Sequence, residues 1–77
     1  MKMYVGNLDF QTTDKDLLNA FAAYGSVFTA NVMRNGTTGD PHCYGYVEMK
    51  DQRQAEAALI GLEGHEVHGR KLTVRAA

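Results

Sequence analysis

Apolar residues recur at helical spacing in a stretch near the start of the chain. Leu17, Phe21 and Tyr24 stand at positions i, i+4 and i+7, which places them on one face of a helix. Thr13 is a suitable N-cap, and the acidic residues that follow it suit the positive end of the helix dipole. Gly25 is a natural left-handed stop. The pattern predicts a helix of about three turns with one apolar face.

A second stretch with the same spacing lies in the later half of the chain. Its apolar positions at i, i+3, i+4 and i+7 are Ala55, Ala58, Leu59 and Leu62. Asp51 can cap the start of this helix, while Gly61 and Gly64 mark its end. The chain is therefore predicted to contain two amphipathic helices.

Four other segments have the composition of β-strands. They are residues 3–5, 27–34, 42–50 and 71–75. The first strand is predicted to end near Gly6, because Gly6-Asn7 is a turn pair. Residues 35–41 consist almost entirely of turn formers, so they are predicted to form a loop between the second and third strands.

The third and fourth of these strands alternate between two kinds of side chain. In the third strand, Tyr44, Tyr46 and Glu48 are predicted to point to one face. The other face receives a smaller and more apolar set, which is Cys43, Gly45, Val47 and Met49. In the last strand the apolar Leu72 and Val74 alternate with Lys71, Thr73 and Arg75. Each strand is therefore predicted to have one buried face and one solvent face.

The element order is β-α-β-β-α-β, which predicts an α+β fold of the ferredoxin-like, split β-α-β type. In this fold a four-stranded antiparallel sheet carries both helices on one face, and the other face is open to water. We expect Tyr4, Tyr44 and Tyr46 on the open face, where a cluster of aromatic rings indicates a binding function. With the second strand in matching register, this face also receives Thr29, Asn31 and Met33.

Length and composition are those of one small folded domain, expected to span residues 1–77. The chain has 77 residues, which suffices for one compact core and not for two. Hydrophobic residues make up 44% and charged residues 22%, with one proline, and this is far from the composition of disordered chains.

The single cysteine, Cys43, excludes an internal disulfide framework and any site built from several thiolates. We therefore expect a reducing, cytoplasmic environment. No apolar run reaches membrane-spanning length, and residues 1–5 lead into strand-like sequence without a signal-peptide core, so no membrane partner is expected.

Two segments carry a resemblance to a known family. Residues 3–8 (MYVGNL) match the hexamer motif of the RNA recognition motif family. Residues 42–49 (HCYGYVEM) match in part its octamer motif, basic-Gly-aromatic-Gly-aromatic-aliphatic-any-aromatic. The chain thus resembles this family across nearly its whole length, and it is similar to small single-module bacterial members. The resemblance implies a monomeric domain that binds single-stranded RNA, is no enzyme, and uses no cofactor or small-molecule substrate.

The resemblance also implies roles for individual residues. Tyr4 and Tyr44 take the positions of base-stacking rings, and Tyr46 packs against bases or riboses between them. Stacking on such a ring contributes about 1–3 kcal/mol per base. The residues expected to contact RNA are Tyr4, Tyr44, Tyr46, His42, Lys2, Asn31, Lys71 and Arg75.

The octamer departs from the family pattern at three positions. His42 replaces the arginine or lysine expected to contact a phosphate, so a permanent positive charge is missing there. Cys43 replaces glycine and Met49 replaces an aromatic residue, and both are soft side chains that bury easily. The last two are therefore predicted to be packing variations.

The net charge of −1 alone argues weakly against nucleic acid as a partner. The distribution of charge changes this, because Lys2, Lys71 and Arg75 are predicted to lie on the open face or at its edge. The acidic residues predicted on the helix layer are Asp14, Asp16, Asp51 and Glu56. A nearly neutral chain can thus present a basic sheet face and an acidic back.

Several alternatives remain open. A domain of this family can bind a protein instead of RNA, and stacking does not distinguish RNA from single-stranded DNA. An acylphosphatase-like enzyme on the same topology would need an arginine-bearing phosphate loop after the first strand, and residues 7–11 (NLDFQ) supply none. A copper-chaperone-like site would need two spaced cysteines there. His65 and His68, expected in a flexible connection, make a weak metal site without further ligands.

Overall fold

The computed structural model describes residues 1–33 and 42–77, with His42 described by its backbone alone. Its elements are β1 (Lys2–Asp9), α1 (Asp14–Ala22), β2 (Thr29–Met33), β3 (His42–Glu48), α2 (Gln52–Leu62), β4 (Glu66–Val67), β5 (Arg70–Lys71) and β6 (Thr73–Ala76). The predicted loop at residues 35–41 and the predicted end of the second strand at Arg34 lie outside the described residues.

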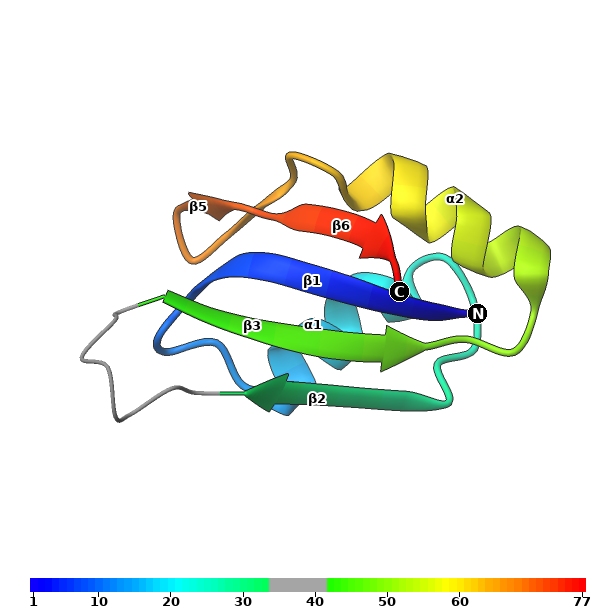
Figure 1. Ribbon diagram of the computed structural model, residues 1–77, viewed down its shortest axis with the longest axis horizontal. Coiled ribbons are helices and arrows are strands. Elements are labelled where there is room, and N and C mark those ends of the chain that lie inside the picture. Colours follow the sequence, from blue (N-terminus) through cyan, green and yellow to red (C-terminus); the bar gives the residue numbers. More distant parts are fainter. Residues whose placement is uncertain (34–41) are drawn as a thin grey trace.

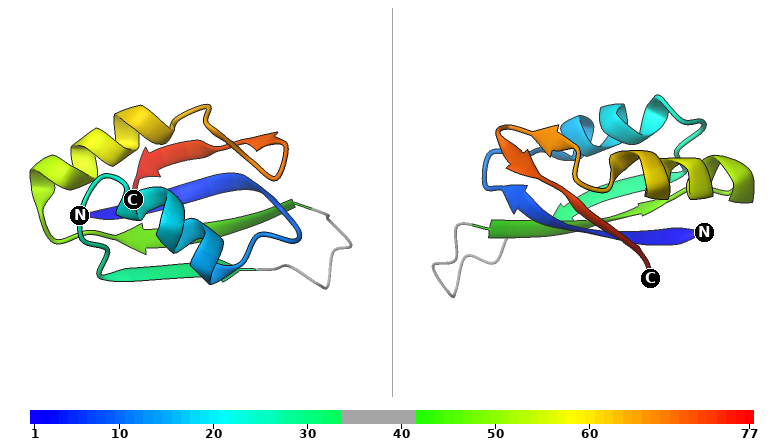
Figure 2. Two further views of the ribbon diagram at one scale, coloured as in Figure 1. Left: turned by 180° about the vertical axis from the view of Figure 1, so that it is seen from behind. Right: turned by 90° about the horizontal axis from the view of Figure 1, so that it is seen from above.

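Four strands form one sheet in the order β2-β3-β1-β6, and every neighbouring pair is antiparallel. Both helices lie on the same face of this sheet (Figures 1 and 2). The N-terminus of β1 and the C-terminus of β6 lie side by side (Figure 1), where the Ala77 amide donates a hydrogen bond to the Lys2 carbonyl. The predicted α+β, ferredoxin-like fold is confirmed.

Both helices begin at the caps that the sequence predicts. Thr13 forms a capping box with Asp16, in which each side chain accepts a hydrogen bond from the other residue's backbone amide. The Asp51 carboxylate accepts a hydrogen bond from the Gln54 amide and so caps α2. Helix α1 ends at Ala22, and Gly25 follows with a positive φ of +153°.

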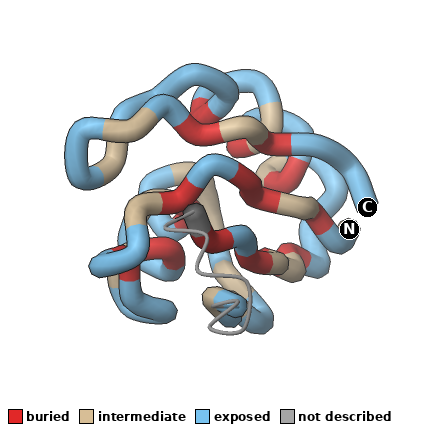
Figure 3. The backbone as a smooth tube through the Cα atoms, turned by 60° about the vertical axis from the view of Figure 1, so that its left-hand side comes forward, coloured by how far each residue is buried: buried red, intermediate tan, exposed pale blue. Residues whose placement is uncertain are grey.

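The core lies between the helices and the covered face of the sheet. Its buried residues are Met3, Val5, Leu8, Leu17, Phe21, Cys43, Val47, Met49, Ala55, Ala58, Leu62, Leu72 and Val74. Figure 3 shows buried positions recurring along the central strands between half-buried and exposed ones. The half-buried Tyr24 joins the two helices, because its phenol ring lies where a side chain at Gly61 would have to be.

The first strand corrects one prediction, because it does not end near Gly6 but continues to Asp9. Val5 pairs with Gly45 and Leu8 with Cys43, so two residues of β1, Gly6 and Asn7, stand opposite one residue of β3. This is a β-bulge. The extra residue lets Met3, Val5 and Leu8 all face the core, which a regular alternation of two could not do. Gly6-Asn7 is therefore a bulge and not a turn.

Asn7 holds the bulge through contacts with the far end of the chain. Its φ is +61°, a conformation that asparagine tolerates better than most residues. Its Nδ2 donates to the Lys71 carbonyl at 2.7 Å, and the Arg70 guanidinium donates to Asn7 Oδ1 at 2.5 Å and to its carbonyl at 3.3 Å. These bonds tie β1 to β5.

The predicted last strand is divided in the structure. Arg70 and Lys71 form β5, which pairs with β4 in a separate two-stranded hairpin, and β6 of the main sheet begins only at Thr73. The predicted second strand is also shorter, because β2 begins at Thr29 and not at residue 27. None of the helices among the described residues is long and apolar enough to cross a membrane.

Candidate nucleic-acid interface

A row of four residues crosses the uncovered face of the sheet from edge to edge. Asn31 of β2 pairs with Tyr46 of β3, Tyr46 pairs with Tyr4 of β1, and Tyr4 pairs with Arg75 of β6. Paired residues of neighbouring strands lie on the same face. The structure therefore brings four of the predicted contact residues into one line across the sheet.

The rings of Tyr4, Tyr44 and Tyr46, called the stacking platform below, form a triangle on this face. Their centroids lie 5.9–6.1 Å apart. Tyr4 and Tyr44 are stacked, with 27° between their planes, and Tyr46 meets them edge-on at 67° and 89°. Tyr44 is 38% exposed and the other two are half-buried, partly against one another. Three adjacent π-surfaces are thus presented to solvent.

Two glycines shape the strands that carry the platform. A Cβ on Gly6 would lie 2.8 Å from the Tyr4 hydroxyl, so the Tyr4 ring can lie over the backbone only because residue 6 has no side chain. On the covered face, a Cβ on Gly45 would lie 2.6 Å from the Asn31 carbonyl oxygen and 3.0 Å from Leu17 Cδ2. Gly45 therefore allows α1 to pack closely behind the platform.

Cations lie at two sides of the platform. The Lys2 ammonium stands 4.8 Å from the centroid of the Tyr46 ring, within the range of a cation–π interaction. Arg75, at the other end of the row, is exposed. Lys71 is not on the main sheet but on the β4–β5 hairpin, where it is exposed. The His42 backbone pairs with Asp9, and its side chain lies outside the described residues.

The sequence predicts a basic sheet face and an acidic back. The open face is less basic than this, because it also carries an acidic residue. Glu48 occupies the next row, where it pairs with Lys2 on one side and with Thr29 on the other. The paired positions bring the Glu48 carboxylate and the Lys2 ammonium to the same part of the face. Two of the three octamer variations, Cys43 and Met49, are buried, which confirms that they are packing changes.

The two histidines of the predicted flexible connection belong to the region of the β4–β5 hairpin. His65 directly precedes β4, and His68 lies between the two strands. His68 stands in the hairpin turn with φ +51°, and its Nε2 lies 3.0 Å from Asp16 Oδ2 at the start of α1. This contact, followed by the Thr13 backbone hydrogen bond, holds the pKa of Asp16 below its usual value. Within residues 1–33 and 42–77, no three His, Cys, Asp or Glu side chains gather in a way that could hold a metal ion.

Sequence reasoning missed one pair beside this face. Phe28 and Lys50 stand at adjoining ends of β2 and β3, with the Lys50 ammonium 4.0 Å from the centroid of the exposed Phe28 ring. Phe28 lies within the predicted second strand, where its alternation with Thr29 would have placed it towards the helices. The signal that could have found it is the large aromatic residue at an edge-strand position beside a turn.

Comparisons with known proteins find relatives and solved structures that match along the whole chain. Glycine-rich RNA-binding protein 1 of Mycosarcoma maydis is 40% identical over 99% of this chain, which spans only 43% of that protein. The putative RNA-binding protein RbpF of Nostoc is 40% identical over the whole chain and 73% of its own length. The crystal structure of RNA Binding Protein PG1 superposes with a TM-score of 0.87 at 39% identity, covering all of this chain and 93% of the other.

The sequence profile of the RNA recognition motif matches residues 3–73, which include both motif strands and both helices. This match covers nearly the whole chain, and RbpF, of which the chain covers 73%, is 40% identical to it. The chain belongs to the RNA recognition motif family.

Proposed function

We propose that this domain binds single-stranded RNA by stacking bases on Tyr4 and Tyr44, with Tyr46 packed between the bases or against a ribose. The observation that carries the proposal is the triangle of three tyrosine rings, 5.9–6.1 Å apart, on the sheet face away from the helices. Bases of a single strand have exposed π-faces that match such a surface, whereas bases of a duplex are already stacked.

The family and the names of the relatives support the same conclusion. Glycine-rich RNA-binding protein 1 and RbpF are both named as RNA-binding proteins, and both match across essentially the whole domain. The fold adds a physical reason, because aromatic rings on the covered face would be part of the core, while these rings contact one another and still leave ring surface open to a ligand.

Polar residues around the platform fit supporting roles. Lys2 and Arg75 can bind phosphates, and the Asn31 amide can donate to and accept from a base edge. Lys71 can reach a phosphate only beside the sheet, since it belongs to the hairpin. His42 keeps the phosphate-binding role that its motif position predicts. The proposed protein is a monomer that binds RNA without catalysing a reaction. It needs no cofactor, and it acts in a reducing cytoplasm.

Titration with a short single-stranded RNA tests the proposal. The chain has no tryptophan and four tyrosines, three of them in the platform, so tyrosine fluorescence reports base stacking directly. Tyr44→Ala and Tyr4→Ala should each weaken binding by about 1–3 kcal/mol, while Tyr44→Phe should bind almost like wild type because the ring remains. Tyr24→Phe, on the helix side, is the matched control.

Circular dichroism of each variant separates loss of binding from loss of fold. Folded alanine variants with wild-type affinity would show that the platform does not carry binding. A wild-type protein that binds no RNA even at low salt would refute the proposed function itself. Repeating the titration with DNA of the same sequence distinguishes RNA from single-stranded DNA, because only the former offers 2′-hydroxyls to polar side chains such as Asn31.

A further inference from the structure

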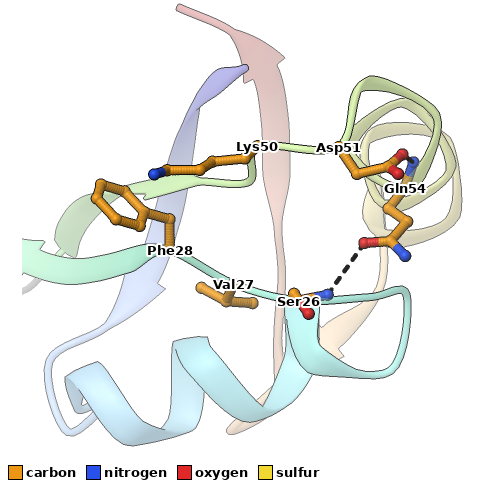
Figure 4. Close-up of a pocket in the computed structure, with 6 residues that line it drawn as sticks. All are labelled: Ser26, Val27, Phe28, Lys50, Asp51 and Gln54. Carbon is orange, nitrogen blue, oxygen red and sulfur yellow. Dashed lines mark hydrogen bonds between the residues drawn. The ribbon is translucent and has the colours of Figure 1, made fainter.

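A pocket of about 340 Å³ opens at one corner of the sheet, where β2 begins and α2 starts (Figure 4). It is lined by Ser26, Val27, Phe28, Lys50, Asp51 and Gln54. The segment after α1 forms one wall, and the turn between β3 and α2 forms the other (Figure 4). The pocket therefore lies beside the stacking platform and not within it.

An aromatic ring and a cation dominate the pocket. Phe28 is 57% exposed, although burying such a ring is ordinarily favourable. The Lys50 ammonium lies 4.0 Å from the centroid of this ring (Figure 4) and leaves more than half of Phe28 accessible. The pair repeats the arrangement of Lys2 and Tyr46 on the open face, where the distance is 4.8 Å.

The Asp51 carboxylate and the Gln54 side-chain oxygen in the pocket already accept hydrogen bonds. The Asp51 carboxylate accepts the Gln54 amide at the start of α2, and Gln54 Oε1 accepts the Ser26 amide at 3.0 Å. Among the described residues, the Lys50 ammonium contacts the Phe28 ring and no carboxylate. A ligand that reaches the Phe28 side of the pocket therefore meets the Lys50 ammonium and the aromatic ring together, while the Asp51 carboxylate, which keeps its charge, is bonded to the Gln54 amide at the start of α2.

Backbone pairing connects the edge of the pocket to the strand that carries the platform. The Phe28 amide donates to the Glu48 carbonyl at 2.7 Å, and the next residue, Thr29, pairs with Glu48 on the open face. Glu48 stands two residues after Tyr46 on the same strand. Tyr46 and Glu48 lie about 7 Å apart along the strand, so a short stretch of extended nucleic acid can reach from the platform to the strand end beside Phe28.

We propose that Phe28 and Lys50 form an additional nucleotide subsite for the RNA strand that crosses the platform. A base stacks on the exposed Phe28 ring, and the Lys50 ammonium turns from the ring to the adjoining phosphate. Charge and shape favour a nucleotide here, because its phosphate is anionic and can pair with the Lys50 ammonium, while its base can stack on the Phe28 ring. The inference rests on the proposed function, and it gives the domain a longer binding site than the platform alone.

Binding of RNAs of different length tests the subsite with the full chain. Oligouridylate and oligoadenylate, each of four and ten nucleotides, serve as probes. Phe28→Ala should weaken binding of the ten-nucleotide RNAs about fivefold or more and leave that of the four-nucleotide RNAs unchanged. Lys50→Gln should reduce the slope of log affinity against log salt by roughly 0.7 for the longer RNAs only.

A matched control and an independent readout complete the test. Ile60→Ala truncates a side chain of α2 that is 78% exposed, away from the pocket, and should not alter binding at either length. The backbone amide signals of Ser26 and Gln54 should shift on titration with a ten-nucleotide RNA and stay in place with a four-nucleotide RNA.

Each result has a distinct meaning. If Phe28→Ala weakens both lengths equally, or neither, the subsite does not exist, and the platform proposal stands as long as the short RNAs still bind. If Phe28→Ala binds the longer RNAs as tightly as wild type, the inference is overturned, and a protein becomes the candidate ligand of the pocket. If wild-type protein binds neither length, the proposed function fails and the subsite fails with it.

Discussion

Strand β3 presents two different surfaces, one to the helices and one to solvent. Cys43, Gly45 and Val47 are buried against the core, while Tyr44 and Tyr46 between them face away from it. The buried residues pack against other parts of the same chain, whereas the proposed function gives the exposed ring surface of the tyrosines a ligand to contact. Substitutions at the buried positions should therefore change the free energy of unfolding, and substitutions at the tyrosines between them should change the affinity for RNA.

The largest expected effect lies on the covered face. Phe21 is fully buried, and Phe21→Ala removes its ring and leaves a cavity, so it should lower the free energy of unfolding by about 3–5 kcal/mol. Urea denaturation followed by circular dichroism measures this change. The fraction that remains folded should keep wild-type affinity for RNA. An unchanged unfolding midpoint would show that Phe21 is not a core residue.

A sharper version of the comparison uses the glycine between the two tyrosines. Gly45→Ala places a methyl group 2.6 Å from the Asn31 carbonyl oxygen, so it should destabilise the fold by about 1–3 kcal/mol. Although Gly45 belongs to the octamer motif, the affinity of the folded protein should change little. The same denaturation assay, combined with RNA titration below the unfolding range, checks both statements. A large loss of affinity with normal stability would place Gly45 at the ligand.

His42→Arg should act in the opposite sense, on binding alone. An unperturbed imidazole is mostly neutral above pH 7, so a phosphate contact from His42 should strengthen as the pH falls towards 6. Arginine supplies a permanent charge, and it should steepen the salt dependence by roughly 0.7 in log–log slope and flatten the pH dependence. Fluorescence titrations between pH 6 and pH 8 at several salt concentrations measure both. Equal slopes for variant and wild type would assign the phosphate contact to other cations.

The smallest effect concerns Asp16 and His68, which join α1 to the β4–β5 hairpin on the surface. The pKa of Asp16 is lowered in the folded state, first by the His68 hydrogen bond, so its contribution to stability is fully present above the unfolded pKa of 3.8. That contribution is lost as the pH falls through the lower folded pKa. His68→Ala should raise the pKa of Asp16 towards 3.8, as an NMR titration of the carboxyl carbon would show. An unmoved pKa would mean that the Thr13 amide alone holds the carboxylate.

Local signals in the sequence were sufficient for most of the fold. Thr13 and Asp51 cap their helices as predicted, because a cap depends on groups within one turn. The alternation around Tyr44 and Tyr46 gave the correct face for both. These features depend on neighbours in the chain, which the sequence displays directly.

The errors involve contacts between distant segments. The bulge at Gly6 and Asn7 is stabilised by hydrogen bonds from Asn7 to Lys71 and from Arg70 to Asn7, 63 or 64 residues away, and a local turn signal cannot reveal such contacts. In the same region, Lys71 pairs with Glu66 of β4 and so lies in the separate hairpin and not in the main sheet. The Phe28–Lys50 pair also forms only when β2 and β3 align. Pairing of this kind is decided by tertiary structure and not by local propensity.

The buried thiol of Cys43 has a practical consequence. Cys43 is 3% exposed, lies behind the tyrosines and pairs with Leu8 across the junction of β1 and β3. A thiol-alkylating reagent can reach it only when these two central strands open. The chain has one cysteine, so the rate of alkylation reports that opening without any introduced label. An RNA that spans β1 and β3 would favour the closed state and slow the alkylation in proportion to its occupancy.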